Sequence, residues 1–176
     1  MTQRVTATGP YPALIAWLES HHIPYELHEH PKTYTAAETA HAEGTDPRTF
    51  AKVVGVRTSD GSNALVVVDA SDQVDLGRLR EAMGVSRVAL LSEEELSDLL
   101  PDCDVGTLPP IPELVKVPVY VDEAVRADEK ISFHAGSHRY TVRVDRTSWE
   151  RAAEVHHGEF GVQRRSLRDI SERRWT

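Results

Sequence analysis

KVVGVRTSDGSNALVVVD, residues 52–69, is the stretch from which the fold can be deduced. Two valine-rich runs, Lys52–Thr58 and Ala64–Asp69, flank Ser59-Asp60-Gly61-Ser62. Asp-Gly between two such runs is a strong signal for a β-hairpin. The second run contains Leu65-Val66-Val67-Val68, which is continuously apolar. We therefore expect the second strand to lie at the centre of a sheet.

The segment before this hairpin predicts two helices and a strand. Apolar residues recur on one helical face from Pro12 to about His21, and residues 25–30 alternate as a short strand. Thr35-Ala36-Ala37-Glu38 is a capping-box pattern that opens a second helix, which Gly44 closes.

The segment after the hairpin predicts further helices and strands. In order, these are a helix over 75–83 ended by Gly84, a strand over 87–91, a helix opened by Ser92 and running to about 100, a strand over 115–121, and a hairpin of strands 130–133 and 139–144. Ala135-Gly136-Ser137 is expected to form the turn of that hairpin. Thr147-Ser148-Trp149-Glu150 is expected to cap a terminal helix.

This order of elements predicts the fold class. Hairpins occur among the helices, so single strands and helices do not alternate strictly. This order favours an α/β domain with a mixed, largely antiparallel sheet surrounded by helices. A length of 176 residues suits a single domain. Neither a GxGxxG sequence nor a Walker A sequence is present, which argues against a doubly wound nucleotide-binding fold.

Composition and charge limit the possible partners. The net charge of −8 argues against a protein that coats nucleic acid, and no DNA partner is expected. Residues 154–176 are rich in arginine, which suits contact with an RNA end but equally suits a solvated helix of alternating charges. No apolar run approaches the length of a membrane span, so no membrane association is expected. The single cysteine, Cys103, fits a reducing cytoplasm.

Gly106-Thr107-Leu108-Pro109-Pro110 is a candidate binding loop. Its glycine allows backbone angles closed to other residues, and its prolines stiffen the exit and carry no N–H. The remaining amides are free to point at a carbonyl oxygen or an oxyanion, as acyl-transfer chemistry requires. Gly and Pro also mark ordinary turns, so the loop is a candidate binding site only in combination with the residues around it.

Two side chains are candidates for polar contact with a ligand. Lys52 begins a strand whose apolar neighbours predict burial. Its side chain either faces a cleft or extends to water along a sheet edge. His134 ends a strand, where it either contacts a substrate or bonds to its own turn. Cys103 lies between two aspartates that would raise the pKa of its thiol, so it is a poor nucleophile. The histidines lack recognisable metal spacing, and we expect no metal and no cofactor.

Taken in order, these motifs resemble the YbaK/prolyl-tRNA-synthetase-associated editing domains, which are aminoacyl-tRNA deacylases. The resemblance covers about residues 11–153. Its motifs are Ile23-Pro24-Tyr25-Glu26-Leu27, His30-Pro31, Thr35-Ala36-Ala37-Glu38, Ala51-Lys52-Val53-Val54, Val74-Asp75-Leu76, Gly106-Thr107-Leu108-Pro109-Pro110, Val119-Tyr120-Val121-Asp122 and Ala135-Gly136. Residues 154–176 lie outside it, as an arginine-rich extension.

The resemblance implies an activity and a set of site residues. It implies a curved mixed sheet and hydrolysis, in the cytoplasm, of the ester that joins a wrong amino acid to its tRNA. Lys52 stands in the place of the family's essential lysine, and residues 106–110 stand in the place of the loop that holds the aminoacyl group. His134 stands where some relatives carry a functional histidine. The implied partners are the 3′ aminoacyl-adenosine end of a mischarged tRNA and an aminoacyl-tRNA synthetase.

Two departures from the family pattern bear on which amino acid is accepted. Pro112 stands where a glycine often follows the loop, and Val53 stands where some members have asparagine after the lysine. Two other interpretations stay open. One is a non-catalytic module of the same fold that binds an aminoacyl-adenosine-like ligand or a synthetase. The other is a hydrolase of small esters unrelated to tRNA.

Overall fold

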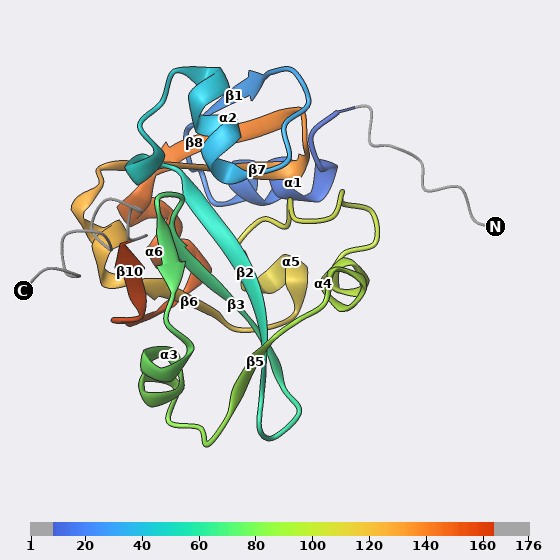
Figure 1. Ribbon diagram of the computed structural model, residues 1–176. Helices are drawn as coiled ribbons and strands as arrows, with labels where there is room; N and C mark the ends of the chain where they lie inside the picture. The colour runs from blue at the N-terminus through green and yellow to red at the C-terminus, as the bar shows by residue number, and fades with distance from the viewer. Residues whose placement is uncertain (1–8, 164–176) are drawn as a thin grey trace, which may run out of the picture.

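The computed structural model describes residues 9–163, and its strands form three sheets (Figure 1). The five-stranded sheet has the order β5 (Val88–Leu90), β2 (Ala51–Thr58), β3 (Asn63–Asp69), β6 (Val119–Asp122) and β9 (His156–Gly158). The three-stranded sheet has the order β1 (Tyr25–Glu29), β8 (Tyr140–Asp145) and β7 (Lys130–Ser137). The two-stranded sheet pairs β10 (Gly161–Gln163) with β4 (Asp72–Val74).

The predicted hairpin of residues 52–69 is confirmed. β2 and β3 pair antiparallel with Lys52 opposite Val68 and Arg57 opposite Asn63. On its other side β3 pairs in parallel with β6, so β3 is an interior strand as its apolar run predicted. The pairings β3–β6 and β6–β9 are parallel, whereas the other pairings of the sheets are antiparallel. The mixed α/β fold class is therefore confirmed.

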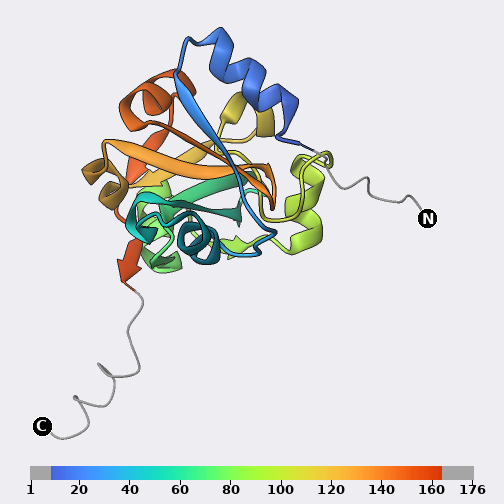
Figure 2. The ribbon, with the colours of Figure 1, turned by 90° about the horizontal axis from the view of Figure 1, so that it is seen from above.

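The continuous apolar run of β3 is explained by burial on both of its faces. Leu65 and Val67 belong to the main core, which also contains the inward residues of β7 and β8. Val66 and Val68 face the opposite side and pack in a second cluster with Leu79. Because side chains alternate along a strand, only an apolar residue at every position can serve two cores. Figure 2 shows the blue and orange strands of the three-stranded sheet stacked against the green strands of the hairpin.

Six α-helices and two short 3-10 helices surround these sheets in residues 9–163. They are α1 (Pro12–Ser20), α2 (Ala36–Glu43), α3 (Leu76–Met83), α4 (Glu93–Leu99), α5 (Pro112–Val115), α6 (Arg146–Ala153), η1 (Pro47–Thr49) and η2 (Glu123–Ala127). Thr35 caps α2 and Ser92 caps α4 through the amide three residues on, as the sequence predicted. Gly44 and Gly84 end α2 and α3 in the left-handed conformation.

The strand predicted over 115–121 is wrong at its beginning. Residues 112–115 form the short helix α5, and β6 begins only at Val119. Pro112 occupies the first turn of this helix, where its missing N–H costs nothing. Lys116 ends the helix with a φ of 59°.

The turn of the last hairpin and the cap of the last helix also differ from the prediction. β7 continues through Ser137, so the turn lies at residues 138–139, and the register shifts between His134 and Ser137. Gly136, with a φ of 78°, thus belongs to a β-bulge. Asp145 caps α6 by accepting a bond from the Ser148 amide, in place of the predicted Thr147.

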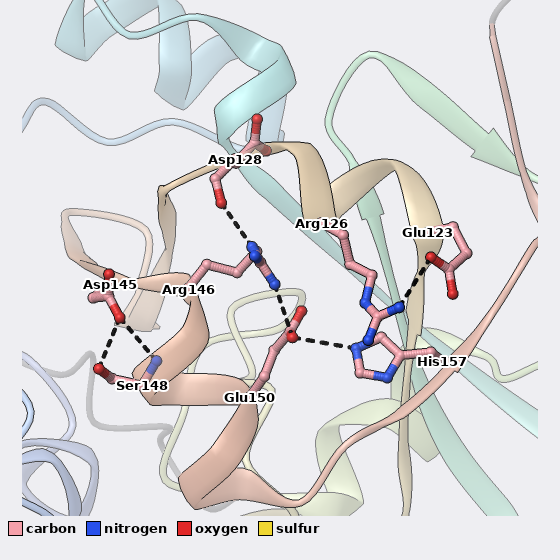
Figure 3. A network of polar contacts seen from close by, with 8 residues as sticks. All are labelled: Glu123, Arg126, Asp128, Asp145, Arg146, Ser148, Glu150 and His157. Atoms are coloured by element: carbon pink, nitrogen blue, oxygen red, sulfur yellow. Dashed lines mark hydrogen bonds and ion pairs between the residues drawn. The ribbon is translucent and has the colours of Figure 1, made fainter.

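A polar network attaches α6 to neighbouring segments (Figure 3). Arg146 donates to the backbone carbonyl of Asp128 at 2.6 Å and to Glu150 at 2.8 Å. The same Glu150 carboxylate lies 3.3 Å from Nε2 of His157 on β9. The network thus joins α6 to the segment before β7 and to the edge of the five-stranded sheet.

The strands β9 and β10 were not anticipated from the sequence. Asp122 at the end of β6 accepts bonds from the amides of Phe160 and Gly161, which positions the chain between these two strands. Residues 156–158 and 161–163 of the predicted extension are therefore part of the sheets. The remaining arginines, from Arg164 on, lie outside the described residues. No helix in residues 9–163 is long and apolar enough to cross a membrane.

Candidate active site

A pocket of about 250 Å3 lies between β2, β7, the start of α2 and the Gly106 loop. Its lining residues are Tyr34, Thr35, Ala36, Lys52, Val53, Val54, Gly106, Leu108 and His134. The structure thus brings together Lys52, Gly106, Leu108 and His134 from segments far apart in the sequence. Thr107, Pro109 and Pro110 do not line this pocket, although they belong to the same predicted loop.

Thr107 anchors the loop from within. Its amide donates to the Asp104 carbonyl at 3.2 Å, and its hydroxyl donates to the same oxygen at 2.7 Å. Its own carbonyl accepts a bond from the Gly136 amide at 3.1 Å. Thr107 is 1% exposed, so these bonds satisfy its polar groups away from water. The role of Thr107 is therefore to hold the loop in shape.

Two residues of the loop that line the pocket, Gly106 and Leu108, have backbone amides without a protein acceptor within residues 9–163. Pro109 and Pro110 follow without an N–H, and both are buried. The Pro110 carbonyl accepts a bond from the Trp149 indole at 3.1 Å, which fixes the exit of the loop. Two donors are thus left for a ligand oxygen in a loop whose Thr107 and Pro110 carbonyls are already bonded within the protein.

Gly136 connects the loop to the strand that carries His134. Its carbonyl accepts a bond from the Asp104 amide at 3.0 Å, beside the bond that its amide donates to Thr107. A Cβ at this position would lie 2.6 Å from Cβ of Tyr11 and 3.0 Å from Sγ of Cys103. Only glycine allows this close approach.

Lys52 lies on β2 and is half-buried at the pocket. Its ammonium donates a hydrogen bond to the backbone carbonyl of Asp72. Burial raises the pKa of the Asp72 carboxyl, as does the charge of Asp122, whereas Lys52 lowers it. The ammonium is thus held by a contact that fixes the direction of its side chain.

His134 is almost completely enclosed, with 7% of its surface exposed. Burial, together with His138 and His30, lowers the pKa of its imidazole to about 3. The ring packs edge-on against Phe50, with centroids 5.3 Å apart, and its Nε2 lies 3.0 Å from Oγ1 of Thr39. His134 is therefore a neutral imidazole that can form hydrogen bonds but holds no charge near neutral pH.

Sequence reasoning missed Tyr34, which stands at the mouth of the pocket. Its side chain is 69% exposed, an unusual state for a large aromatic group. Nζ of Lys32 lies 5.4 Å from the ring centroid, and the His138 ring lies 5.5 Å away. An aromatic residue in the polar segment between His30-Pro31 and the capping box was the available signal.

The thiol of Cys103 is no part of this site. It is 5% exposed, and its pKa is raised to about 12, first by burial and then by Asp102 and Asp104. The predicted rise in the pKa of this thiol is confirmed, but burial contributes more to it than the two aspartates do. Within residues 9–163, no cluster of three His, Cys, Asp or Glu side chains is arranged to hold a metal ion.

A second, acidic hollow of about 460 Å3 lies beyond Lys52 and Asp72. Asp69 lines it and is 8% exposed. Burial raises the pKa of Asp69 to about 7, with smaller contributions from Asp128, Asp72, Asp122 and Asp46. This hollow is lined by three aspartates and one arginine, whereas the first pocket is lined by Lys52 and His134 and, among the described residues, by no carboxylate.

Comparison with known proteins assigns the chain to a family. The profile of the aminoacyl-tRNA editing domain matches residues 30–152, and the chain belongs to this family. No curated protein sequence matches the chain at a significant level.

Solved structures share the fold at low sequence identity. The crystal structure of hypothetical protein APE2540 superposes with a TM-score of 0.76 and 19% identity, covering 85% of this chain and 99% of that one. The crystal structure of a proposed trans-editing enzyme for prolyl-tRNA synthetase superposes with a TM-score of 0.72 and 21% identity, covering 86% and 98%. These likenesses show that the fold extends over nearly the whole of both proteins.

Proposed function

We propose that this protein is a trans-editing aminoacyl-tRNA deacylase, which hydrolyses the ester of a mischarged tRNA in the cytoplasm. The observation that supports this most directly is that Gly106 and Leu108, whose amides have no protein acceptor in the described part of the chain, line one small pocket with Lys52 and His134. Membership of the editing-domain family supports tRNA editing in general.

The Gly106 and Leu108 amides bind the carbonyl oxygen of the ester. Water adds to the carbonyl carbon, and the oxygen that becomes negative is stabilised by these two donors. The bond to the ribose oxygen then breaks, so the tRNA hydroxyl and the free amino acid are released. One proton of the water ends on the ribose oxygen and the other leaves as the acid ionises. Preorganised amide donors of this kind contribute about 10²–10³-fold each in rate.

Lys52 anchors the nucleotide part of the substrate. Its half-buried ammonium offers a fixed positive charge, and a terminal phosphate or ribose oxygen is the natural partner. Binding energy at this remote group holds the ester against the loop and reduces the entropic cost of the reaction. The carboxylates of the hollow beyond Asp72 keep the phosphate on the pocket side of the lysine.

Tyr34 supplies a stacking surface for the terminal adenine. The exposed ring lies at the mouth of the pocket, and Lys32 stands close to its face. Aromatic side chains beside a positive charge are typical of proteins that bind unpaired nucleotides. The net charge of −8 opposes long-range attraction of tRNA, so binding is expected to be weak and salt-sensitive.

The size of the pocket selects the amino acid. A volume of about 250 Å3, shared with part of the ribose, favours small side chains. Apolar pockets discriminate by only about 10–200-fold for one methylene, which is why a separate editing step is useful. Candidate substrates are cysteinyl- and alanyl-tRNA(Pro), followed by tRNAs mischarged with serine or threonine. An aminoacyl-tRNA synthetase is the proposed partner in delivery.

The proposal is tested by incubating the protein with a panel of labelled aminoacyl-tRNAs, correctly and incorrectly charged. Selective loss of one or two mischarged esters supports trans-editing. If no ester is cleaved but an aminoacyl-adenosine analogue binds, the protein is a non-catalytic module of the same fold. Equal turnover of an aminoacyl-tRNA and of the corresponding small ester would contradict a role for tRNA.

A further inference from the structure

Thr39 lies at the meeting point of three polar contacts behind the pocket. It belongs to α2 and is fully buried. Its Oγ1 is 2.8 Å from the Thr35 carbonyl oxygen, 2.6 Å from Oγ1 of Thr33 and 3.0 Å from Nε2 of His134. All three distances are within the range of hydrogen bonds.

The chemistry of these groups determines where each proton lies. The Thr35 carbonyl carries no proton, so the contact at 2.8 Å must be donated by the single hydroxyl proton of Thr39. Thr39 has no second proton, and its oxygen must accept the other two bonds. The Thr33 hydroxyl therefore donates to Thr39. For the same reason Nε2 of His134 carries a proton and donates it to Thr39.

The other ring nitrogen of His134 is then an acceptor. Burial keeps the imidazole neutral near pH 7, so protonation at Nε2 leaves a lone pair at Nδ1. Nδ1 forms no hydrogen bond within residues 9–163. It is also absent from the set of fully buried side-chain atoms without a partner, so part of its surface is accessible. Because His134 lines the pocket, this accessible atom is available to a bound molecule.

We propose that Thr39 is a positioning residue that locks His134 in the Nε2–H tautomer, so that Nδ1 accepts a hydrogen bond from an N–H or O–H group of the bound substrate complex. This inference rests on the proposed deacylation for the identity of the ligand. Two donors lie next to the ester carbon in that reaction, the α-amino group of the amino acid and the attacking water. His134 orients one of them without taking its proton.

The tautomer is tested without any assay of activity. Histidine labelled with ¹⁵N in the full chain gives separate resonances for protonated and unprotonated ring nitrogens. We expect His134 in the wild type at pH 7 to show a protonated Nε2 and an unprotonated Nδ1. A protonated Nδ1, or a rapidly exchanging mixture of the two tautomers, would overturn the inference. This result is independent of whether the protein cleaves an ester.

The role of Thr39 is tested with a matched pair of substitutions. Thr39→Ser keeps the hydroxyl and should preserve the tautomer and the deacylation rate. Thr39→Val keeps the shape, removes the acceptor and should give mixed tautomers with a loss of about 5- to 10-fold in kcat/KM, the worth of one hydrogen bond. If Thr39→Val leaves the Nε2–H tautomer fully populated, Thr39 is not the positioning residue.

A double-mutant cycle separates positioning from a merely structural effect. If Thr39 acts through His134, Thr39→Val should cost nothing further in a His134→Phe background. An equal loss in both backgrounds would show that Thr39 only supports α2 and would contradict the proposal. Repeating the comparison with an acyl-tRNA that lacks the α-amino group distinguishes the two donors. The penalty disappears if Nδ1 binds the α-amino group and persists if it binds water.

Discussion

The amide of Gly136 donates a hydrogen bond to the carbonyl of Thr107 at 3.1 Å, and this bond joins the two halves of the candidate site. The loop that presents the free amides lies on one side of it. The strand that carries His134 lies on the other, with His134 two residues before Gly136 in β7. The bulge in β7 thus sets the position of the loop relative to the imidazole.

This connection makes Gly136 sensitive to substitution. Gly136→Ala should lower the free energy of unfolding by about 2–4 kcal/mol, because a Cβ would clash with Tyr11 and Cys103 at a positive φ. Gly61→Ala is the matched control, since Gly61 has a φ of 84° and open space around its Cβ position. It should cost only about 1 kcal/mol. Urea denaturation measures both, and equal losses would show that packing at Gly136 is unimportant.

Gly106 is expected to affect the rate more than the stability. Gly106→Ala has no steric clash but strains a φ of 78°, and relief of that strain turns a donor amide away from the pocket. We expect deacylation to fall by about 10- to 100-fold. Gly84→Ala carries a similar strain at a φ of 66° and should leave the rate unchanged. Single-turnover deacylation distinguishes them, and a wild-type rate for Gly106→Ala would argue against the loop as the carbonyl-binding group.

Tyr34 is predicted to act through its ring. Tyr34→Ala should raise KM by about 5- to 100-fold, the worth of stacking on one base, with little change in stability because the side chain is exposed. Tyr34→Phe keeps the ring and should bind like the wild type. Steady-state kinetics at constant salt measures both. A large effect of the phenylalanine substitution would instead assign the contact to the hydroxyl group.

Asp69 makes stability depend on pH in a defined direction. The pKa of its carboxyl is about 7 in the folded protein and near 3.8 in the unfolded chain, so the folded state binds the proton more tightly. The contribution of Asp69 to the unfolding free energy is therefore greatest below pH 3.8, and it falls as the pH rises toward about 7. Asp69→Asn removes this loss and should stabilise the protein at pH 8 by up to about 4 kcal/mol.

The control for this prediction is Asp98→Asn, which changes an exposed carboxylate by the same chemistry. It should change stability little at either pH. The gain from Asp69→Asn should shrink at pH 4, where the carboxyl of the folded wild type is already protonated. A gain that is equal at pH 4 and pH 8 would show that the charge of Asp69 is not the cause.

The elements that could be predicted from the sequence are those determined by residues close together in the chain. The hairpin of residues 52–69 was predictable because its turn and its apolar run lie within one short segment. The caps Thr35 and Ser92 bond to amides three residues away, so the pattern alone identified them. Helix α5 was missed because its four residues lie in an apolar stretch that also suits a strand.

The features that were missed depend on distant contacts. β9 and β10 are three residues each, and their positions depend on Asp122 and on partners far along the chain. Thr39 contacts His134 across 95 residues, and a threonine within a helix gives no sign of this in the sequence. Lys52, Gly106, Leu108 and His134 were selected by motif and resemblance, and the structure places all four around one pocket.

The most direct test of the central claim is deacylation of the aminoacyl-tRNA panel by Lys52→Ala and Lys130→Ala. Lys130 is an exposed lysine on β7 outside the pocket, so its substitution removes the same charge. We predict that Lys52→Ala loses cleavage of the mischarged species by at least about 100-fold, whereas Lys130→Ala matches the wild type. Cleavage by Lys52→Ala at the wild-type rate would contradict the proposed role of the pocket.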